Sequence, residues 1–388
     1  MTLTLSPAHQ LADQLPMLDW ITDPQRVGRL SQDFAWFSPV LKAALAGKHG
    51  DIVVRPRTED EIRQVVGACA KAAIPITVRG TGTGNYGQST PLHGGVILDL
   101  SAYNAFCWVR GGRGRAQAGI RLSEFDTQAR GSGQELRWLP STFRSATLGG
   151  LFGGGFGGAG SINHGPLAAP GLLKKEVCFL AAPIPDHLTT LAEFLPTGCQ
   201  AVLLIVAPHA EEGLAEMVAA HGGTLSYRKS AEEVQKSNRT LLEYTWNHTT
   251  LQALKVDKNL TYIQSGFDPA RKLEQVKALE KALAGEVMMH LEFLRTKEGV
   301  FNCSGLQLIR YSSEARLNQI MQIYRDHGVQ INNPHVYIVE DGKQNNLDPA
   351  VVRAKERFDP QGLLNPGKLR SWATREARTV EGLAPLVA

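Results

Sequence analysis

Short apolar runs and one helical stripe organise the first third of the chain. The runs 51–56, 74–78 and 96–100 are rich in Val, Ile and Leu and predict three strands. Between the first two runs, Thr58 followed by Glu61 is a capping-box pattern, and the apolar residues after it recur at helical spacing. The order strand, helix, strand, loop, strand predicts a small α/β layer.

The pattern continues with a predicted strand at 116–120, a predicted helix at 122–131 and then a glycine-rich stretch. Eight of the fourteen residues 147–160 are Gly. We expect neither a packed helix nor a strand there, because glycine weakens both. Backbone that closely approaches a bound molecule is the physical use of such a stretch.

Beyond about residue 170, strands and helices alternate in an ordinary way. The apolar run Ala201–Ala207 predicts a buried strand, and 211–221 predicts a helix. Asp268 precedes one helical stripe of apolar residues, and His327 follows another. We expect an antiparallel sheet with helices in this part of the chain.

Size and composition place the chain among soluble enzymes. Its 388 residues allow two or three domains, and the 43% of apolar and 20% of charged residues are near globular averages. A net charge of +4 without a long Lys/Arg run gives no reason to expect nucleic acid as a partner. Neither a signal-peptide pattern nor a run of about 20 apolar residues is present, so we expect a cytoplasmic protein without a transmembrane segment.

The cysteines and histidines give no sign of a metal. The five cysteines are odd in number and lack a CxxC pair, which argues for reduced thiols and against a disulfide framework or a zinc site. His290, His327 and His335 have no partners at ligand spacing. We therefore expect no metal.

The loop Arg79–Asn85 carries the clearest chemistry. Its glycines alternate with threonines, so successive backbone N–H groups can turn toward one anion such as a pyrophosphate. Arg79 and Asn85 would add charge and hydrogen bonds to phosphate or ribose. The turn-rich residues 86–95 follow the loop. Because a Rossmann fingerprint and a P-loop both lead into a helix, the loop is neither of these. An ordinary turn between two strands is the alternative interpretation.

Three motifs resemble one family. The run from 54 to 100 is similar to the PCMH-type FAD-binding domain of the vanillyl-alcohol oxidase superfamily, which includes glycolate oxidase subunits and D-lactate dehydrogenases. Residues 145–165 resemble its second FAD-contact segment, and 358–368 its C-terminal signature beside the isoalloxazine ring. The resemblance implies FAD and these cofactor-binding residues: Arg79, Gly80, Thr81, Gly82, Thr83, Gly84, Asn85, Ser145, Thr147, Gly149, Gly150, Gly157, Gly158, Ser161, His164, Asn365 and Lys368.

The same resemblance implies the architecture. We expect an α+β protein in which a two-part PCMH-type FAD-binding domain carries an α/β cap domain, inserted before a C-terminal segment that returns to the flavin. Only about ten residues separate Gly165 from Lys175, where the family usually has further strands. The expected division is an N-terminal extension at 1–50, the FAD-binding domain at 51–174, the cap at 175–340 and the returning segment at 341–388.

The chain departs from relatives that tether FAD covalently. Thr83 stands where those relatives have His, and residues 140–144 lack the Cys that some of them add. We therefore expect non-covalent FAD.

Proton transfer is assigned to residues close to the C-terminal motif. His335 or Tyr337 would take a proton from the donor while hydride leaves to flavin N5. We expect both residues on a strand, where half-buried packing is the alternative role. Glu292 and Arg310 are weaker candidates for orienting a substrate, since charges on half-exposed strands usually face solvent.

These features predict an FAD-dependent oxidase or dehydrogenase that acts on a small alcohol or 2-hydroxy acid. The alternative is a flavin-binding, non-catalytic accessory subunit of an oxidoreductase complex, and a nicotinamide-binding Rossmann enzyme is disfavoured because no helix follows Gly84. The expected partners are the small-molecule substrate and either a redox partner or a second copy of the chain.

Overall fold

The computed structural model consists of two units. The first unit comprises residues 1–134, 144–153 and 333–388, and the second comprises 135–143 and 154–332. The segment that carries His335 and Tyr337 thus belongs to the first unit, whereas the sequence placed it at the end of the cap. The structure describes residues 6–154, 176–237, 239–295, 300–342 and 347–372; the short connection Gly165–Lys175 lies outside them.

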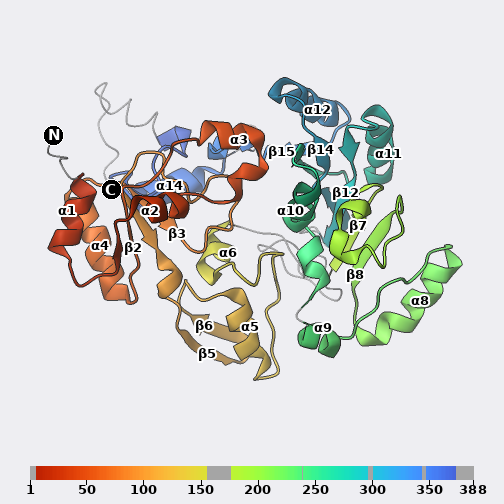
Figure 1. The fold of residues 1–388 in the computed structure, drawn as a ribbon, viewed down its shortest axis with the longest axis horizontal. Coiled ribbons are helices and arrows are strands. Elements are labelled where there is room, and N and C mark those ends of the chain that lie inside the picture. The colour runs from red at the N-terminus through yellow and green to blue at the C-terminus, as the bar shows by residue number, and fades with distance from the viewer. Residues whose placement is uncertain (1–5, 155–175, 238, 296–299, 343–346, 373–388) are drawn as a thin grey trace. The chain divides into compact units, whose positions relative to one another are not determined.

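A four-stranded sheet forms the centre of the first unit (Figure 1). Three neighbouring strands of this sheet run parallel, as expected for a strand–helix–strand unit. The fourth strand, at one edge, is antiparallel to its neighbour. The three predicted strands are confirmed. In spatial order the strands are β1 (Trp20–Ile21), β2 (Ile52–Val54), β4 (Val96–Asp99) and β3 (Ile76–Arg79).

Helices cover both faces of this sheet. The helix α4 (Glu59–Lys71) begins at the predicted cap, where Thr58 Oγ1 accepts a hydrogen bond from Glu61 N at 3.2 Å. With α1 (Pro7–Gln14) it buries one face of the sheet, and α2 (Pro24–Leu30) covers the other. Residues 6–50 are therefore part of the first unit's core and not a separate extension.

The prediction of a strand at 116–120 is wrong. Instead, β5 (Phe106–Arg110) and β6 (Arg113–Ala116) form a hairpin that ends where the predicted strand would begin. The turn is made by Gly111 and Gly112, whose φ angles of 55° and 72° suit the twisted two-residue hairpin loop. The helix α5 (Leu122–Arg130) follows as predicted.

The glycine-rich stretch begins with a helix that we did not expect. The helix α6 spans Leu148–Gly154. Thr147 Oγ1 accepts a hydrogen bond from Gly150 N at 3.2 Å, and Leu151 is buried. One cap and one buried side chain are thus sufficient to hold two turns of glycine-rich backbone.

The C-terminal segment joins the edge of the first unit's sheet. After α13 (Val339–Gly342) and α14 (Pro349–Phe358), Leu364 forms a parallel bridge with Ile76 of β3. Ile76 N donates to Leu363 O at 2.8 Å, and Asn365 N donates to Ile76 O at 2.7 Å. The return therefore ends beside the strand that leads into the first glycine loop.

The second unit contains a six-stranded antiparallel sheet, as predicted, together with a three-stranded one. In spatial order, the strands of the larger sheet are β15 (Gln330–Asn332), β10 (Gln264–Gly266), β13 (Phe301–Gly305), β12 (His290–Arg295), β7 (Glu176–Leu180) and β8 (Ala201–Ile205). The smaller sheet contains β11 (Val287–Met288), β14 (Leu308–Arg310) and β9 (Leu260–Tyr262).

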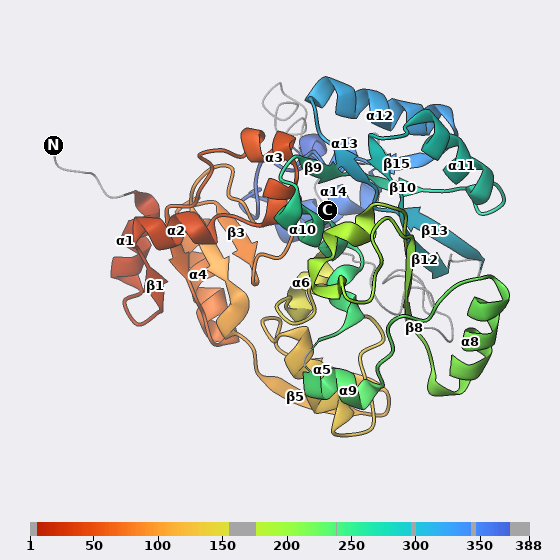
Figure 2. The same ribbon diagram turned by 45° about the vertical axis from the view of Figure 1, so that its right-hand side comes forward.

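The helices predicted in the second half are present. Figure 2 shows α11 and α12 close together, and Gln275 Nε2 on α11 donates to His327 O at the end of α12 at 3.1 Å. No helix in the described ranges combines the length and the apolar character needed to cross a membrane. The helices of this unit are α8 (Glu211–Ala220), α9 (Ala231–Ser237), α10 (Asn247–Val256), α11 (Lys272–Ala282) and α12 (Glu314–Asp326).

Candidate functional site

The loop that follows β3 presents backbone donors that have no partner in the described part of the chain. Within the described residues, the N–H groups of Thr81, Gly82, Thr83 and Gly84 donate no hydrogen bond, and all four residues are only half-buried. Backbone N–H groups in folded proteins are nearly always paired with protein, water or ligand. This run of consecutive donors agrees with the anion-binding nest predicted from the sequence.

Arg79 has a different place from the one we expected. Its side chain is buried, and its guanidinium donates to Leu30 O and Gln32 O at 2.8 Å each and to Thr81 O at 3.3 Å. Burial lowers its pKa, against the nearby carboxylates of Asp99 and Asp33, which raise it. Arg79 therefore fixes the shape of the loop from behind instead of extending a charge toward a ligand.

Two glycines of the loop are required by contacts with the rest of the unit. Gly82 has a φ of +70°, and a Cβ built there would collide with the Arg79 guanidinium. A Cβ on Gly80 would collide with Thr147 Oγ1. Side chains at these positions would displace the two groups that hold the loop.

The two glycine segments meet in space. Thr81 Oγ1 donates to Ser145 O at 2.6 Å, and Gly80 lies against Thr147. In the first turn of α6, Gly149 N donates to Ala118 O at 2.8 Å. The structure thus brings the first loop next to the start of the second segment, while the predicted residues Gly157, Gly158, Ser161 and His164 lie outside the described residues.

Asn365 and Lys368 hold the turn that follows the loop. Lys368 Nζ donates to Gly87 O at 2.6 Å and to Gln88 O at 2.8 Å, and Asn365 Nδ2 also donates to Gln88 O, at 2.9 Å. Burial lowers the pKa of Lys368 to about 8, although the carboxylate of Asp33 opposes the change. The two residues act on the loop through backbone carbonyls.

We expect Lys368→Met to destabilise the first unit, because it removes the two charged hydrogen bonds to Gly87 O and Gln88 O, which keep only neutral donors. The loss should be about 2–4 kcal/mol of unfolding free energy, since hydrogen bonds to a charged group contribute more than neutral ones. Urea denaturation, monitored through the release of the bound cofactor, measures this loss. Lys48→Met, at an exposed position, is the matched control. Equal midpoints for the two variants would contradict the assignment.

Asp33 belongs to the site although the sequence analysis did not single it out. Its carboxylate accepts from Ala35 N at 2.9 Å and from Ser89 N at 3.4 Å, and burial raises its pKa. It therefore joins the N-terminal segment to the turn after the glycine loop. An Asp before the aromatic run 34–37 is a cap signal, but its distant partner Ser89 left no trace in the sequence.

The two predicted acid–base residues lie in a turn after β15, whereas we expected a strand. His335 is 4% exposed, and its Nδ1 is 2.7 Å from Ser38 Oγ. Its backbone N donates to Asn333 Oδ1 at 2.9 Å. Tyr337 is half-buried and packs against the cluster of Ala35, Leu41 and Leu45. Of the two residues, Tyr337 has the more accessible side chain.

The other two candidates lie in the second unit. Arg310 is exposed at the end of β14 and lies 3.6 Å from the carboxylate of Asp257, as a surface ion pair. Glu292 on β12 is fully buried, so the expectation of a half-exposed charge is wrong. His290, which has no partner at ligand spacing in the sequence, lies against Glu292 and Cys178 in the fold.

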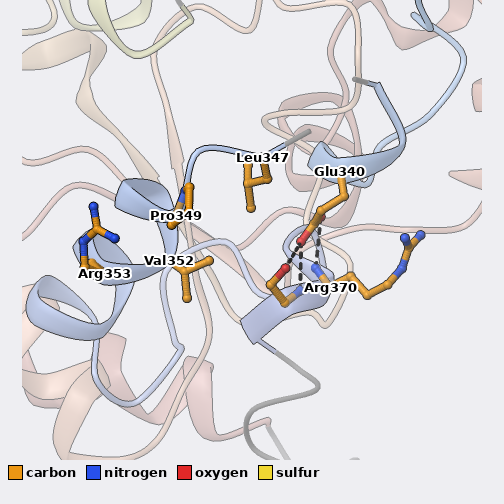
Figure 3. Close-up of a pocket in the computed structure, with 7 residues that line it drawn as sticks. Glu340, Leu347, Pro349, Val352, Arg353 and Arg370 are labelled. Atoms are coloured by element: carbon orange, nitrogen blue, oxygen red, sulfur yellow. Dashed lines mark hydrogen bonds between the residues drawn. The ribbon is translucent and has the colours of Figure 1, made fainter. Parts of the chain in front are cut away.

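A hollow of about 500 Å³ lies between α13, α14 and residues 370–371 (Figure 3). Its polar groups are largely engaged with one another: Glu340 accepts from Ser371 N at 2.8 Å and from Arg370 N at 3.2 Å, while the Arg370 side chain pairs with Asp341. None of its lining residues comes from either glycine segment. We therefore assign no function to this hollow.

Comparison with known proteins identifies the glycine-loop region. A family model described as an FAD binding domain matches residues 50–169. An uncharacterized oxidoreductase of Rhodococcoides fascians is 34% identical over 115 residues, which are 29% of this chain and 25% of the relative. The glycolate oxidase subunit GlcD of Escherichia coli K12 is 27% identical over 128 residues, 32% of this chain and 26% of the relative. The matches thus span about a quarter of these relatives.

Solved structures share the fold over nearly the whole chain. An alkyldihydroxyacetonephosphate synthase superposes with a TM-score of 0.58 at 14% identity, covering 95% of this chain and 88% of the other. A p-cresol methylhydroxylase gives 0.53 at 12% identity, covering 94% and 97%. At these identities the likeness concerns the fold alone, and it confirms the expected α+β architecture.

The residues of the first unit fit FAD. The donors of Thr81–Gly84 suit a pyrophosphate. In addition, Ser89 Oγ and Asn365 Oδ1 are buried and make no hydrogen bond to the described parts of the chain. Buried polar atoms are rarely left without a partner, so these two are available to a ligand.

Proposed function

We propose, from the premise that residues 50–169 are an FAD-binding domain of the kind found in FAD-linked oxidoreductases, that the protein oxidises a small alcohol or a 2-hydroxy acid. The observation that carries the proposal is the run of N–H groups from Thr81 to Gly84, which donate to no described residue and are backed by the buried Arg79. A flavin positioned there is the protein's two-electron acceptor.

Each part of the chain has a defined task in this proposal. The backbone donors of Thr81–Gly84 compensate the charge of the pyrophosphate, and Arg79 keeps them in place without competing for it. Lys368 and Asn365 fix the following turn. Tyr337, on the segment that leads into α13, is proposed to relay the donor's hydroxyl proton, taking it on the phenol oxygen as its own proton passes to solvent, with His335 supporting that turn from the interior.

The substrate class rests on the relatives. The matched relatives include the GlcD subunit of glycolate oxidase, which is similar to 32% of this chain. Glycolate is a 2-hydroxy acid, and the net charge of +4 suits an anionic substrate. We further propose that a redox partner or a second copy of this chain completes the working enzyme, since that relative is named as a subunit.

Anaerobic spectroscopy of the purified protein tests this function. We expect an oxidised flavin spectrum, which one or more members of a panel of small alcohols and 2-hydroxy acids bleach. A flavin that is bound but that no member of the panel reduces would favour the second candidate, a flavin-binding accessory subunit. Protein that is purified without flavin and that does not take up added FAD would refute both candidates.

We expect the FAD to be non-covalent, because Thr83 has no nucleophilic ring nitrogen to bond the flavin. Acid or heat denaturation should therefore release all of the FAD into the supernatant. The absorbance of supernatant and pellet measures the distribution. Yellow colour that stays with the precipitated protein would contradict this prediction.

A further inference from the structure

Four side chains with metal-binding chemistry lie on one face of the second unit's large sheet. Glu176 and Cys178 lie two residues apart on β7, and His290 and Glu292 lie two residues apart on the neighbouring β12. The antiparallel register places Cys178 directly opposite Glu292. Because residues two apart point to the same side of a strand, the pairing brings all four side chains together.

These side chains are enclosed by protein. Cys178, His290 and Glu292 have no exposed surface, and Glu176 has 2%. One ligand atom each from Cys178, His290 and Glu292 lie within 4.8 Å of one another. Such proximity of a thiol, an imidazole and a carboxyl in the interior is unusual for residues that only pack.

A backbone carbonyl orients the imidazole toward the carboxyl. His290 Nδ1 is 3.1 Å from Leu306 O, and since a carbonyl can only accept, the ring proton lies on Nδ1. His290 Nε2 then presents its lone pair to Glu292 Oε1, 2.8 Å away. Metal-binding histidines commonly have this arrangement, with the second ring nitrogen fixed by an outer hydrogen bond.

The carboxylate of Glu292 is positioned at a cost to the backbone. Its Oε1 accepts a hydrogen bond from Trp246 N at 2.5 Å, and Trp246 adopts a φ of 51°, in the left-handed region. Its Oε2 is buried and makes no hydrogen bond within the described ranges, although the Glu176 carboxyl and the Cys178 thiol lie beside it. A bulky residue rarely takes such a φ unless the surrounding structure requires it.

Buried groups of this kind need partners, because an isolated charge in the protein interior is costly. A divalent cation can bind a thiolate, an imidazole and a carboxylate at once.

We propose that the second unit binds one Zn²⁺ ion through Cys178 Sγ, His290 Nε2 and a carboxylate oxygen of Glu292, with the Glu176 carboxylate adding negative charge next to it. Sulfur, imidazole nitrogen and carboxylate oxygen together form a ligand set characteristic of zinc. In a tetrahedral zinc site, ligand atoms lie about 3.3–3.6 Å apart, and the three ligand atoms here lie within 4.8 Å of one another. The proposal departs from the expectation, drawn from the sequence, that no metal is bound.

Sequence spacing could not reveal this site. Cys178 and His290 are separated by more than a hundred residues and form no local motif such as CxxC. Only the pairing of β7 with β12 makes them neighbours.

Metal analysis of the full-length protein tests the proposal. After growth with added zinc and dialysis to remove weakly bound metal, we expect elemental mass spectrometry to give about one zinc ion per chain. Cys178→Ser and the isosteric Glu292→Gln should each reduce zinc to a small fraction of that value. Cys303→Ser is the matched control, since Cys303 is a buried cysteine of the same sheet that pairs with Phe293 and so faces the opposite side.

A second measurement keeps the test independent of folding defects. Wild-type protein and the Cys303→Ser variant, stripped with a chelator, should gain thermal stability when Zn²⁺ is added, whereas the two ligand variants should not. Circular dichroism and FAD content verify that the variants are folded. The proposal would be overturned if wild-type protein is purified without zinc and its melting temperature does not change when Zn²⁺ is added. The four side chains would then share protons among themselves and bind no metal. Zinc retained by both ligand variants at the wild-type level would also overturn it.

Discussion

Gly82→Val is expected to give folded protein that is purified without FAD. The backbone at Gly82 has a φ of +70°, which a β-branched residue strongly disfavours, and a Cβ there would collide with the Arg79 guanidinium. Displacing Arg79 would break its hydrogen bonds to Leu30, Gln32 and Thr81, which hold the loop. The donors of Thr81–Gly84 would then no longer face a common point.

The measurement is the ratio of flavin absorbance to protein absorbance after purification and after incubation with added FAD. The strain of Val at this φ together with the loss of three hydrogen bonds amounts to about 3–5 kcal/mol, or a reduction in FAD affinity of about two to four orders of magnitude. Gly28→Val is the control, because a Cβ at Gly28 in α2 would have nothing within 4 Å. Normal flavin content in the Gly82 variant would place the phosphate site elsewhere.

Local patterns determine the parts of the fold that the sequence predicted well. The capping box at Thr58, the stripe on α4 and the Val/Ile-rich strands around it all act over a few residues, and the structure confirms them. The hairpin at Gly111 was missed because we gave more weight to the apolar residues of 116–120 than to the turn chemistry of two consecutive glycines. The helix α6 was missed because glycine propensity was allowed to outweigh the cap at Thr147.

The site was predicted in its position but not in its internal roles. Alternation of Gly and Thr after a strand indicates a nest, because the backbone alone forms it. Which side chains face the ligand and which face the protein depends on partners far along the chain: Arg79 contacts carbonyls 47 and 49 residues away, and Lys368 contacts carbonyls about 280 residues away. A sequence contains no signal for such pairs without the fold.

The same limit applies to charge burial. Glu292 occupies a strand whose alternation is compatible with a solvent-facing side chain, yet the helix α10 begins over that face and Trp246 N donates to its carboxylate. The sequence contains the alternation but not the identity of the element that covers each face. Buried charge clusters are therefore recognised only after the layers are assembled.

Tyr337→Phe is expected to keep the flavin spectrum while slowing the anaerobic reduction of the flavin. A positioned acid–base group contributes about 10²–10⁴-fold to the rate, or about 3–5 kcal/mol in the barrier. Tyr337 is preferred over His335 because it is only half-buried, whereas His335 is almost fully enclosed and bonded to Ser38. His335→Ala should instead lower stability by about 1–3 kcal/mol, since Ser38 Oγ loses its buried partner.

Stopped-flow reduction with a substrate that bleaches the wild-type flavin measures the first effect, and thermal unfolding measures the second. Tyr103→Phe is the control, because it removes the same hydroxyl from another half-buried tyrosine of the first unit. A packing residue at 337 would change the melting temperature and leave the reduction rate of the folded fraction unaltered. If both the Tyr337 and the His335 variants reduce at the wild-type rate, the proton must pass to another residue, and His164 is the next to test, because the resemblance places it near the flavin ring.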